Sequence, residues 1–202
     1  MTDPALSKRA NDAFDRIRHM DMFAAVNARA FRALLEELTG RTGTKKVYDP
    51  HKAAIEMVRA AILRGAVGTL MSCLDVADRR DNRASIGQIL TILEEPGVFA
   101  VWQPQDPGAL QKVRDTYEAV LKTDPYAKCK ALRNNDIGHL LHGTAPPTVE
   151  YADIFALHDA TEPMVVELCR FVRIAPPRCP DARAHAEKHA KLFWDTYFRA
   201  LP

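Results

Sequence analysis

The sequence predicts an all-α protein, and three observations support this prediction. Apolar residues recur at spacings of three and four along much of the 202-residue chain, which is the pattern of amphipathic helices. Alternating Val/Ile/Thr runs bounded by tight hairpin dipeptides are nearly absent, so strands are not expected. Ser or Asp-Pro precedes several of the periodic segments, as is typical of helix N-termini. We expect about five long and two short helices packed as a bundle.

The first helical segment is predicted over residues 8–38, where apolar side chains recur every three or four positions. Thr39 and Gly40 should end this segment, because glycine readily adopts the left-handed conformation at a helix C-terminus. A polar loop up to Tyr48 is expected to follow.

A second helix should begin at Asp49 and Pro50 and continue to about residue 78. Its middle is apolar almost all the way round, which indicates a central position in the bundle. Gly65 and Gly68 lie within it, and each costs about 0.8–1 kcal/mol of helix stability relative to alanine. We therefore expect another helix to approach closely at these glycines.

The second half of the chain carries further helix start signals. Ser85 should cap a short helix, and Asp-Pro pairs at 106–107 and 124–125 should begin two more. Residues 98–106 are expected to be irregular, with their apolar side chains against the bundle. The predicted helices span about 86–94, 107–122, 125–142, 149–173 and 181–200.

Composition is that of an ordinary globular domain. Hydrophobic residues make up 47% of the chain, which is enough for a substantial core. Charged residues make up 27% and the formal net charge is +2, unlike a strongly basic nucleic-acid coat protein or an acidic disordered tail. We expect a single domain over 1–202, with a core over about 50–172 on which the N- and C-terminal helices pack.

No membrane or secretion signal is expected. The first residues are polar and carry no apolar signal core, and no apolar run of 18 or more residues occurs. The expected location is therefore the cytoplasm.

Metal and cofactor motifs are also absent from the sequence. The four cysteines form no C-x-x-C pair, so neither a zinc ribbon nor a thioredoxin-type site is predicted. His185 and His189 are spaced as a metal-binding pair on the last helix could be, but we expect them to be surface residues. We predict no metal and no cofactor.

The segment from Leu132 to His139 is the strongest functional candidate. Arg133 can grip a phosphate with two parallel hydrogen bonds. His139 can move a proton near neutral pH. Asn134 can orient the substrate or the histidine. This combination suits general acid–base cleavage of RNA, with Arg133 stabilising charge on the phosphate oxygens.

Helix geometry separates the two principal residues. On an ideal α-helix, Arg133 and His139 lie about 120° apart around the axis and about 9 Å apart along it. One copy of the helix therefore cannot easily direct both side chains at one phosphate. Two copies that meet across a two-fold axis can do so, because each arginine then approaches the histidine of the partner.

Neighbouring residues extend the candidate site and also offer a simpler interpretation. Asn135, His139 and His142 share a helix face, and we assign Lys130, Asn135 and His142 to substrate binding. In the alternative interpretation Arg133 pairs with Asp136, and the other polar residues form a solvated helix face.

The run from Ala131 to His139 resembles the signature of the HEPN superfamily, in which four to six residues, the first of them polar, separate an arginine from a histidine; here five residues intervene. The pattern of residues 50–142, including the apolar helix, the charged turn and the segment after Ser85, is similar to the abortive-infection U-type branch. The resemblance implies a HEPN-like helical bundle with additional helices at its ends.

The resemblance also implies a function. Many members are metal-independent endoribonucleases that act as homodimers, often as toxins or in phage defence. Arg133, Asn134 and His139 would then be catalytic, RNA the substrate, and an antitoxin or nucleotidyltransferase-like protein a possible partner. Other members are non-catalytic dimerisation modules that bind a protein or nucleotide, so enzymatic activity stays open at this point.

Overall fold

The computed structural model describes residues 4–21, 26–42, 52–76, 84–102, 106, 108–137, 148–172 and 179–200. Within these ranges the chain forms eight α-helices and no strand, which confirms the predicted all-α helical bundle. The helices are α1 (Pro4–His19), α2 (Val26–Thr42), α3 (Lys52–Cys73), α4 (Ile86–Leu93), α5 (Ala109–Val120), α6 (Asp124–Leu132), α7 (Tyr151–Phe171) and α8 (Cys179–Ala200), with a 3₁₀ turn η3 (Phe99–Trp102) and a π-helical turn η4 (Arg133–Ile137).

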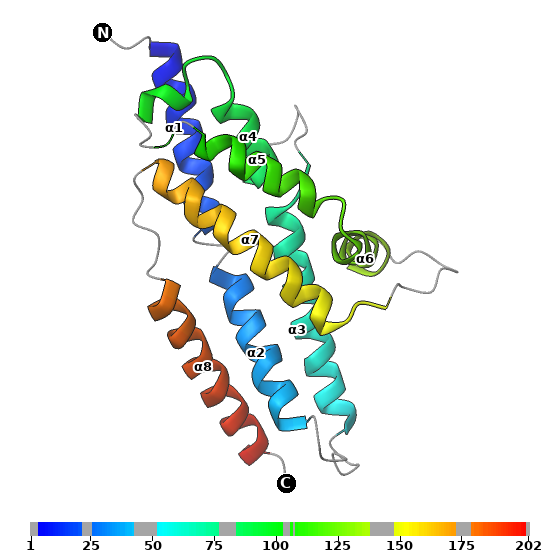
Figure 1. The fold of residues 1–202 in the computed structure, drawn as a ribbon. Helices are drawn as coiled ribbons and strands as arrows, with labels where there is room; N and C mark the ends of the chain where they lie inside the picture. Colours follow the sequence, from blue (N-terminus) through cyan, green and yellow to red (C-terminus); the bar gives the residue numbers. More distant parts are fainter. Residues whose placement is uncertain are drawn as a thin grey trace.

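Helix α7 lies at the centre of the arrangement (Figure 1). It packs against α5 and α6 at one side and against α2 and α3 at another, and it also contacts α1. Helix α8 lies along α2, whereas α1 and α4 pack together towards the other end of the bundle. The short α6 projects to the side, and η4 continues from it towards the C-terminal half of α3.

One cluster of buried apolar residues links α1 with α8. Trp194 anchors α8 in this cluster, because its side chain is fully buried and its Nε1 donates a hydrogen bond to the Leu34 carbonyl of α2 at 3.0 Å. The adjacent Phe193 is 43% exposed. Of these two neighbouring aromatic residues, Trp194 therefore packs in the core and Phe193 is partly exposed.

The N-terminal segment differs from its prediction. The single helix expected over residues 8–38 is two helices, because α1 ends at His19 and α2 begins at Val26. Gly40 does not end α2, which continues to Thr42. Arg41 in this last turn binds Asp195 of α8 at 2.7 Å, so packing against α8 supports the extra turn.

Close helix approach occurs at one of the two α3 glycines. A Cβ atom added to Gly65 would lie 2.6 Å from Cζ of Phe31 on α2, which is closer than real Cβ contacts. The expectation is confirmed at Gly65. It is wrong at Gly68, where an added Cβ would meet nothing within 4 Å.

The ends of α3 differ from their predicted positions or lie outside the described residues. The predicted start at Asp49 and Pro50 is not among the described residues. The helix ends at Cys73, earlier than the predicted residue 78. The hydroxyl of Tyr117 on α5 donates a hydrogen bond to the Asp75 carbonyl at 3.0 Å just beyond this end.

The caps of the middle helices combine confirmed and corrected predictions. Ser85 is the N-cap of α4, as expected, and its side chain accepts a hydrogen bond from the Gln88 amide at 3.3 Å. Thr123, and not Asp124, caps α6 by accepting a hydrogen bond from the Tyr126 amide at 3.4 Å. The region after α4, predicted to be irregular, includes η3.

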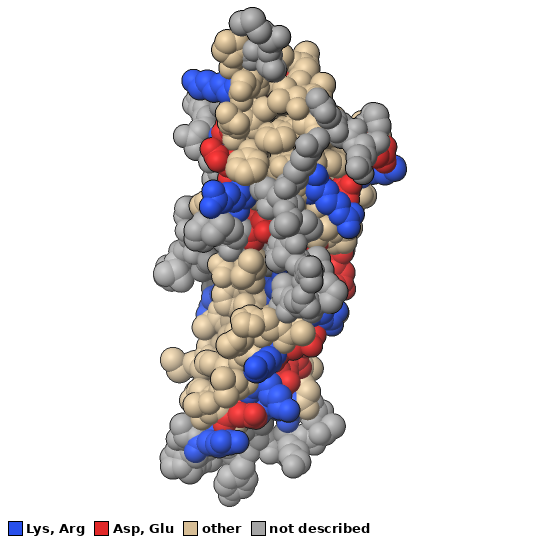
Figure 2. Space-filling model, turned by 90° about the vertical axis from the view of Figure 1, so that its left-hand side faces the viewer, with Lys and Arg blue, Asp and Glu red and all other residues tan. Residues whose placement is uncertain are grey.

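Charges of both signs lie close together on the described surface. Figure 2 shows Lys and Arg side chains beside Asp and Glu side chains along the face that lies on the left of Figure 1. The described residues visible in this view therefore form no broad basic area. Among the described helices, none has the length and apolar composition that a membrane span needs.

Candidate functional site

The predicted motif begins in the last turn of α6 and continues into η4. α6 places Tyr126, Cys129 and Leu132 in the core, so it packs with its apolar side against α7 and α3. The site residues that the structure describes are Lys130, Arg133, Asn134 and Asn135, whereas His139 and His142 lie outside the described ranges.

Arg133 contacts both its neighbour and a distant residue. Its Nη1 donates a short hydrogen bond to Oδ1 of Asp75, just beyond the end of α3. Its Nε donates to Oδ1 of Asn134 at 3.2 Å. The Arg133 side chain is 25% exposed and that of Asp75 is 14% exposed, so this ion pair is largely screened from solvent.

Among the described side chains, the carboxylate that binds Arg133 is that of Asp75, whereas the simpler sequence interpretation concerns a side chain that the structure does not describe. That interpretation paired Arg133 with Asp136, three residues away. The structure pairs it with Asp75, which is 58 positions earlier in the chain. The side chain of Asp136 is outside the described part of the structure.

The π-helical turn changes the geometry that an ideal helix predicts. Residues Arg133–Ile137 form η4, in which backbone hydrogen bonds join residues five apart instead of four. The 120° separation of Arg133 and His139 assumed an uninterrupted α-helix over 125–142, and this assumption is wrong because the α-helix ends at Leu132. Single π turns in α-helices occur frequently at functional sites.

Lys130 and Asn134 are exposed beside Arg133, and Asn135 is half-buried. Lys130 Nζ lies 5.6 Å from the ring centroid of Tyr126, within range of a cation–π interaction. Burial raises the pKa of the Tyr126 hydroxyl, and the Arg133 charge partly opposes that increase. Tyr126 is thus a neutral residue that interacts with both cations.

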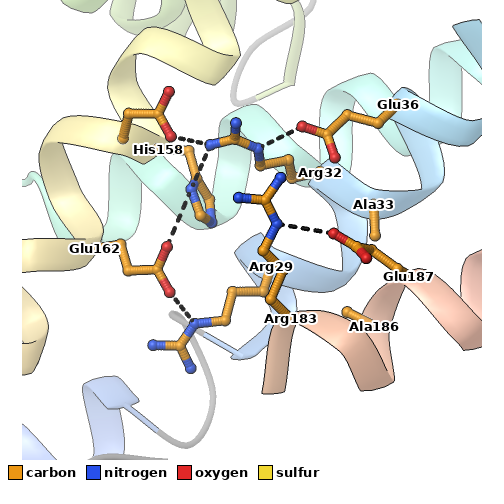
Figure 3. Close-up of a pocket in the computed structure, with 10 residues that line it drawn as sticks. Arg29, Arg32, Ala33, Glu36, His158, Glu162, Arg183, Ala186 and Glu187 are labelled. Atoms are coloured by element: carbon orange, nitrogen blue, oxygen red, sulfur yellow. Dashed lines mark hydrogen bonds and ion pairs between the residues drawn. The ribbon is translucent and has the colours of Figure 1, made fainter. Parts of the chain in front are cut away.

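A second cluster of charged residues lies in a pocket between α2, α7 and α8 (Figure 3). The pocket volume is about 40 Å³, enough for a few water molecules. This pocket was not among the sites expected from the sequence. Its lining residues are Arg29, Arg32, Ala33, Glu36, His158, Asp159, Glu162, Arg183, Ala186 and Glu187.

The arginines of this pocket bind carboxylates that also line it. Arg29 Nε donates to Glu162 Oε1 at 2.7 Å, and Arg183 Nε donates to Glu187 Oε1 at 2.8 Å. Arg32 binds Glu36 at 2.8 Å and also contacts Asp159. Because these arginines already bind carboxylates, the cluster is a network of ion pairs that joins α2 to α7.

His158 is the buried histidine of the network. Its Nδ1 lies 3.1 Å from Nη1 of Arg32. A guanidinium only donates hydrogen bonds, so Nδ1 accepts here and carries no proton. Burial lowers the pKa of His158, and Glu162 opposes this effect without cancelling it. His158 is therefore a neutral, hydrogen-bonded core residue near neutral pH.

Burial leaves some polar atoms of this region without partners. Arg29 is 5% exposed, and its Nη1 and Nη2 have no hydrogen-bond partner among the described residues. The same holds for Oδ1 of Asp21. Burial raises the pKa of Asp21, although the Arg29 charge acts in the opposite direction.

Part of the pocket is foreshadowed in the sequence by charged and polar residues spaced four apart on one helix. Arg32 and Glu36 are spaced four apart, as ion pairs on one helix often are, and the neutral His158 and Glu162 have the same spacing. The contact between Arg32 and His158 joins residues 126 positions apart, so local spacing does not predict it.

The other candidate groups, the histidine pair on α8 and the buried cysteines, are poorly suited to metal binding or nucleophilic chemistry. The rings of His185 and His189 have centroids 4.2 Å apart on the exposed side of α8. Among the described residues, no group of three or more His, Cys, Asp or Glu side chains is arranged to hold a metal ion. Burial raises the pKa of Cys73 and of Cys129 to about 12, which disfavours their reactive thiolate forms.

Comparison with known proteins adds no further assignment. No protein-family model, curated protein or solved structure matches this chain. The function is therefore inferred from the motif residues and from the contacts of Arg133.

Proposed function

We propose that this protein is a metal-independent endoribonuclease of the toxin or phage-defence type. Arg133, Asn134 and His139 form its catalytic group, and Lys130, Asn135 and His142 contact the RNA. The observation that carries the proposal is the placement of Arg133 in a π-helical turn, where its guanidinium is held in a fixed position beside the exposed Lys130.

The chemistry of the proposal is an internal transesterification. His139 takes the proton from the ribose 2′-hydroxyl, and the 2′-oxygen attacks the adjacent phosphorus. The bond between phosphorus and the 5′-oxygen breaks. The 5′-oxygen leaves as a hydroxyl group, because the imidazolium that His139 formed in the first step gives it a proton. Arg133 stabilises the negative charge that develops on the phosphate oxygens, and side-chain groups alone supply these steps.

The proposed active form is a homodimer. The end of α6 and η4 from two protomers would meet across a two-fold axis, so that Arg133 of one protomer and His139 of the other contact the same phosphate. An antitoxin or nucleotidyltransferase-like protein would control this activity in the cytoplasm.

One observation favours a second candidate function, a non-catalytic dimerisation module that binds a protein or nucleotide. The ion pair between Arg133 and Asp75 ties the motif arginine to α3, as a purely structural arginine would be tied. In that case the motif would stabilise the fold and would not act on RNA.

An RNA cleavage assay separates the two functions. The purified protein is incubated with single-stranded RNA and with tRNA in the presence of EDTA, beside Arg133→Ala and His139→Ala. Arg114→Ala is the matched control, since Arg114 is 21% exposed and binds the carboxylate of Glu94 much as Arg133 binds Asp75. We expect cleavage by the wild type and the control but by neither motif variant. Absence of cleavage by the wild type on both RNAs favours the module.

Mixing the two inactive variants tests the shared site. Each heterodimer of an Arg133→Ala and a His139→Ala subunit should have about half of the activity of a wild-type dimer, because one of its two sites holds an intact arginine and an intact histidine. A mixture that stays inactive despite heterodimer formation, measured by mass spectrometry, would place both residues of a site in one protomer.

A further inference from the structure

Asp75 lies at a junction of three helices. It follows the C-terminal end of α3, and its carboxylate accepts the hydrogen bond from Arg133 Nη1 of η4. The Asp75 side chain is only 14% exposed. Its position relative to Arg133 is therefore set by the packing of α3 against η4.

The backbone at Asp75 is itself held by the core. The hydroxyl of Tyr117 on α5 lies 3.0 Å from the Asp75 carbonyl oxygen and 3.4 Å from that of Leu74, so its proton is shared between the two acceptors. Tyr117 is 3% exposed. The hydroxyl satisfies carbonyls that a helix C-terminus leaves without internal partners, and it ties the end of α3 to α5.

Two hydrogen bonds define the orientation of the Arg133 guanidinium. One joins Nη1 to Asp75, and the other joins Nε to Asn134 at 3.2 Å. A guanidinium has five N–H donors in one plane. Fixing two of them sets the plane, and the other three take no part in these two bonds. Because the side chain is 25% exposed, part of it is accessible to a phosphate.

We propose that Asp75 is a positioning residue, which orients the Arg133 guanidinium for the phosphate and keeps that orientation during RNA cleavage. This inference rests on the proposed ribonuclease function. It assigns Asp75 two separable properties: its oxygen holds the guanidinium, and its negative charge weakens the attraction of the site for RNA. The first property acts on kcat and the second on KM.

Steady-state kinetics with Asp75→Asn and Asp75→Ala separate these properties. Asparagine keeps an oxygen acceptor and removes the charge, so kcat should stay within about threefold of wild type while KM falls. Alanine removes the acceptor, so kcat should fall about 10- to 100-fold, as misplaced catalytic groups commonly cause. Equal kcat in the wild type and both variants would overturn the inference.

Glu94→Ala is the matched control, because it deprives Arg114 of its carboxylate partner outside the proposed site. It should leave kcat and KM unchanged within about twofold. Circular dichroism and thermal unfolding identify any variant that fails to fold, and Asp75→Asn then still tests the charge effect on KM.

A double-mutant cycle tests whether Asp75 acts through Arg133. If it does, Arg133→Ala combined with Asp75→Ala should be no slower than Arg133→Ala alone. A further loss of at least about tenfold in the double variant would show that Asp75 acts independently, and it would overturn the inference.

An NMR measurement decides the positioning role even without RNA cleavage. Rotation about the Nε–Cζ bond of Arg133 should be slow in the wild type and in Asp75→Asn, and at least about tenfold faster in Asp75→Ala. Equal rotation rates in all three proteins overturn the inference. If rotation differs as expected but the wild type cleaves no RNA, the proposed ribonuclease function fails while Asp75 still positions Arg133.

Discussion

Arginines meet carboxylates in two regions of this molecule, the η4 turn and the pocket between α2, α7 and α8. In the pocket, Arg29 and Arg32 bind carboxylates of α7, and the buried His158 accepts a hydrogen bond from Arg32. At η4, Arg133 binds one carboxylate among the described side chains, that of Asp75, and the side-chain amide of its neighbour Asn134. The pocket thus combines several ion pairs in one network, whereas η4 presents a single held arginine.

The difference shows that residue type does not by itself indicate function. An arginine near a histidine is the feature that made residues 133–139 a candidate site, yet the described arginine–histidine contact lies in the pocket. There the histidine nitrogen is occupied by the arginine, which suits a structural role. We therefore expect substitutions in the pocket to change stability and substitutions at η4 to change activity.

The largest effect should be on activity at η4. Arg133→Ala should slow RNA cleavage by about 10²–10³-fold, the usual loss when one donor to a developing oxyanion is removed. Initial rates at saturating RNA measure this change, and urea unfolding should show a much smaller change in stability. If the variant unfolds readily but each folded molecule keeps its activity, Arg133 has a structural role like that of the pocket arginines.

The next largest effect should be on stability at the pocket. Glu162→Ala removes the carboxylate that binds Arg29, whose side chain is 5% exposed, and should lower the free energy of unfolding by about 2–3 kcal/mol. Glu187→Ala is the control, because its pair with Arg183 has side chains 52% and 64% exposed and should contribute less than about 1 kcal/mol. Similar losses for the two variants in urea unfolding would contradict the distinction between buried and exposed pairs.

A smaller effect is expected in α3, which contacts both regions. Gly65→Ala should destabilise the protein by about 1–3 kcal/mol, because the added Cβ meets the Phe31 ring at 2.6 Å. Gly68→Ala should stabilise it by about 0.8–1 kcal/mol, since the new methyl group meets no atom within 4 Å and alanine favours the helix.

Thermal and urea unfolding of the two glycine variants check this prediction. Stabilisation by both substitutions would mean that α2 and α3 separate easily at Phe31.

The smallest effect should be a pH dependence from the pocket. The pKa of His158 is lowered by burial, so below about pH 6.5 the unfolded state binds more protons than the folded state. Stability should therefore decrease as pH falls below about 6.5. His158→Gln should reduce this slope in urea unfolding between about pH 5 and 7. An unchanged slope would show that His158 does not titrate as a buried neutral histidine.

The raised pKa of Asp21 acts in the opposite direction, favouring the folded state at acid pH.

Local sequence signals predicted several elements because their causes are local. Ser85 begins α4 through its own bond to the Gln88 amide, and the apolar periods of α7 and α8 gave bounds within about two residues of the observed ones. The break between α1 and α2 was missed, because apolar residues keep a helix-like spacing across it. Thr123 was missed as a cap because the following Asp-Pro pair is itself a strong start signal.

The candidate site was predictable in part. Arg133 and Asn134 are predicted from their chemistry and spacing, and in the structure Nε of Arg133 donates a hydrogen bond to Oδ1 of Asn134 at 3.2 Å. Asp75 could not be selected in this way, since 58 positions separate it from Arg133 and no local pattern links the end of α3 to η4. The contribution of His139 stays a prediction.

The sequence by itself determined the all-α class, most helix positions and the residue types of the candidate motif, because periodicity, caps and side-chain chemistry act over a few neighbouring residues. Only the tertiary structure decided that Asp75 holds Arg133. It also decided that Arg32 binds Asp159 beside the buried His158. These contacts form when helices distant in the chain bury their apolar faces together. Packing brings the end of α3 to η4 and α7 to α2, and the resulting ion pairs follow from that proximity.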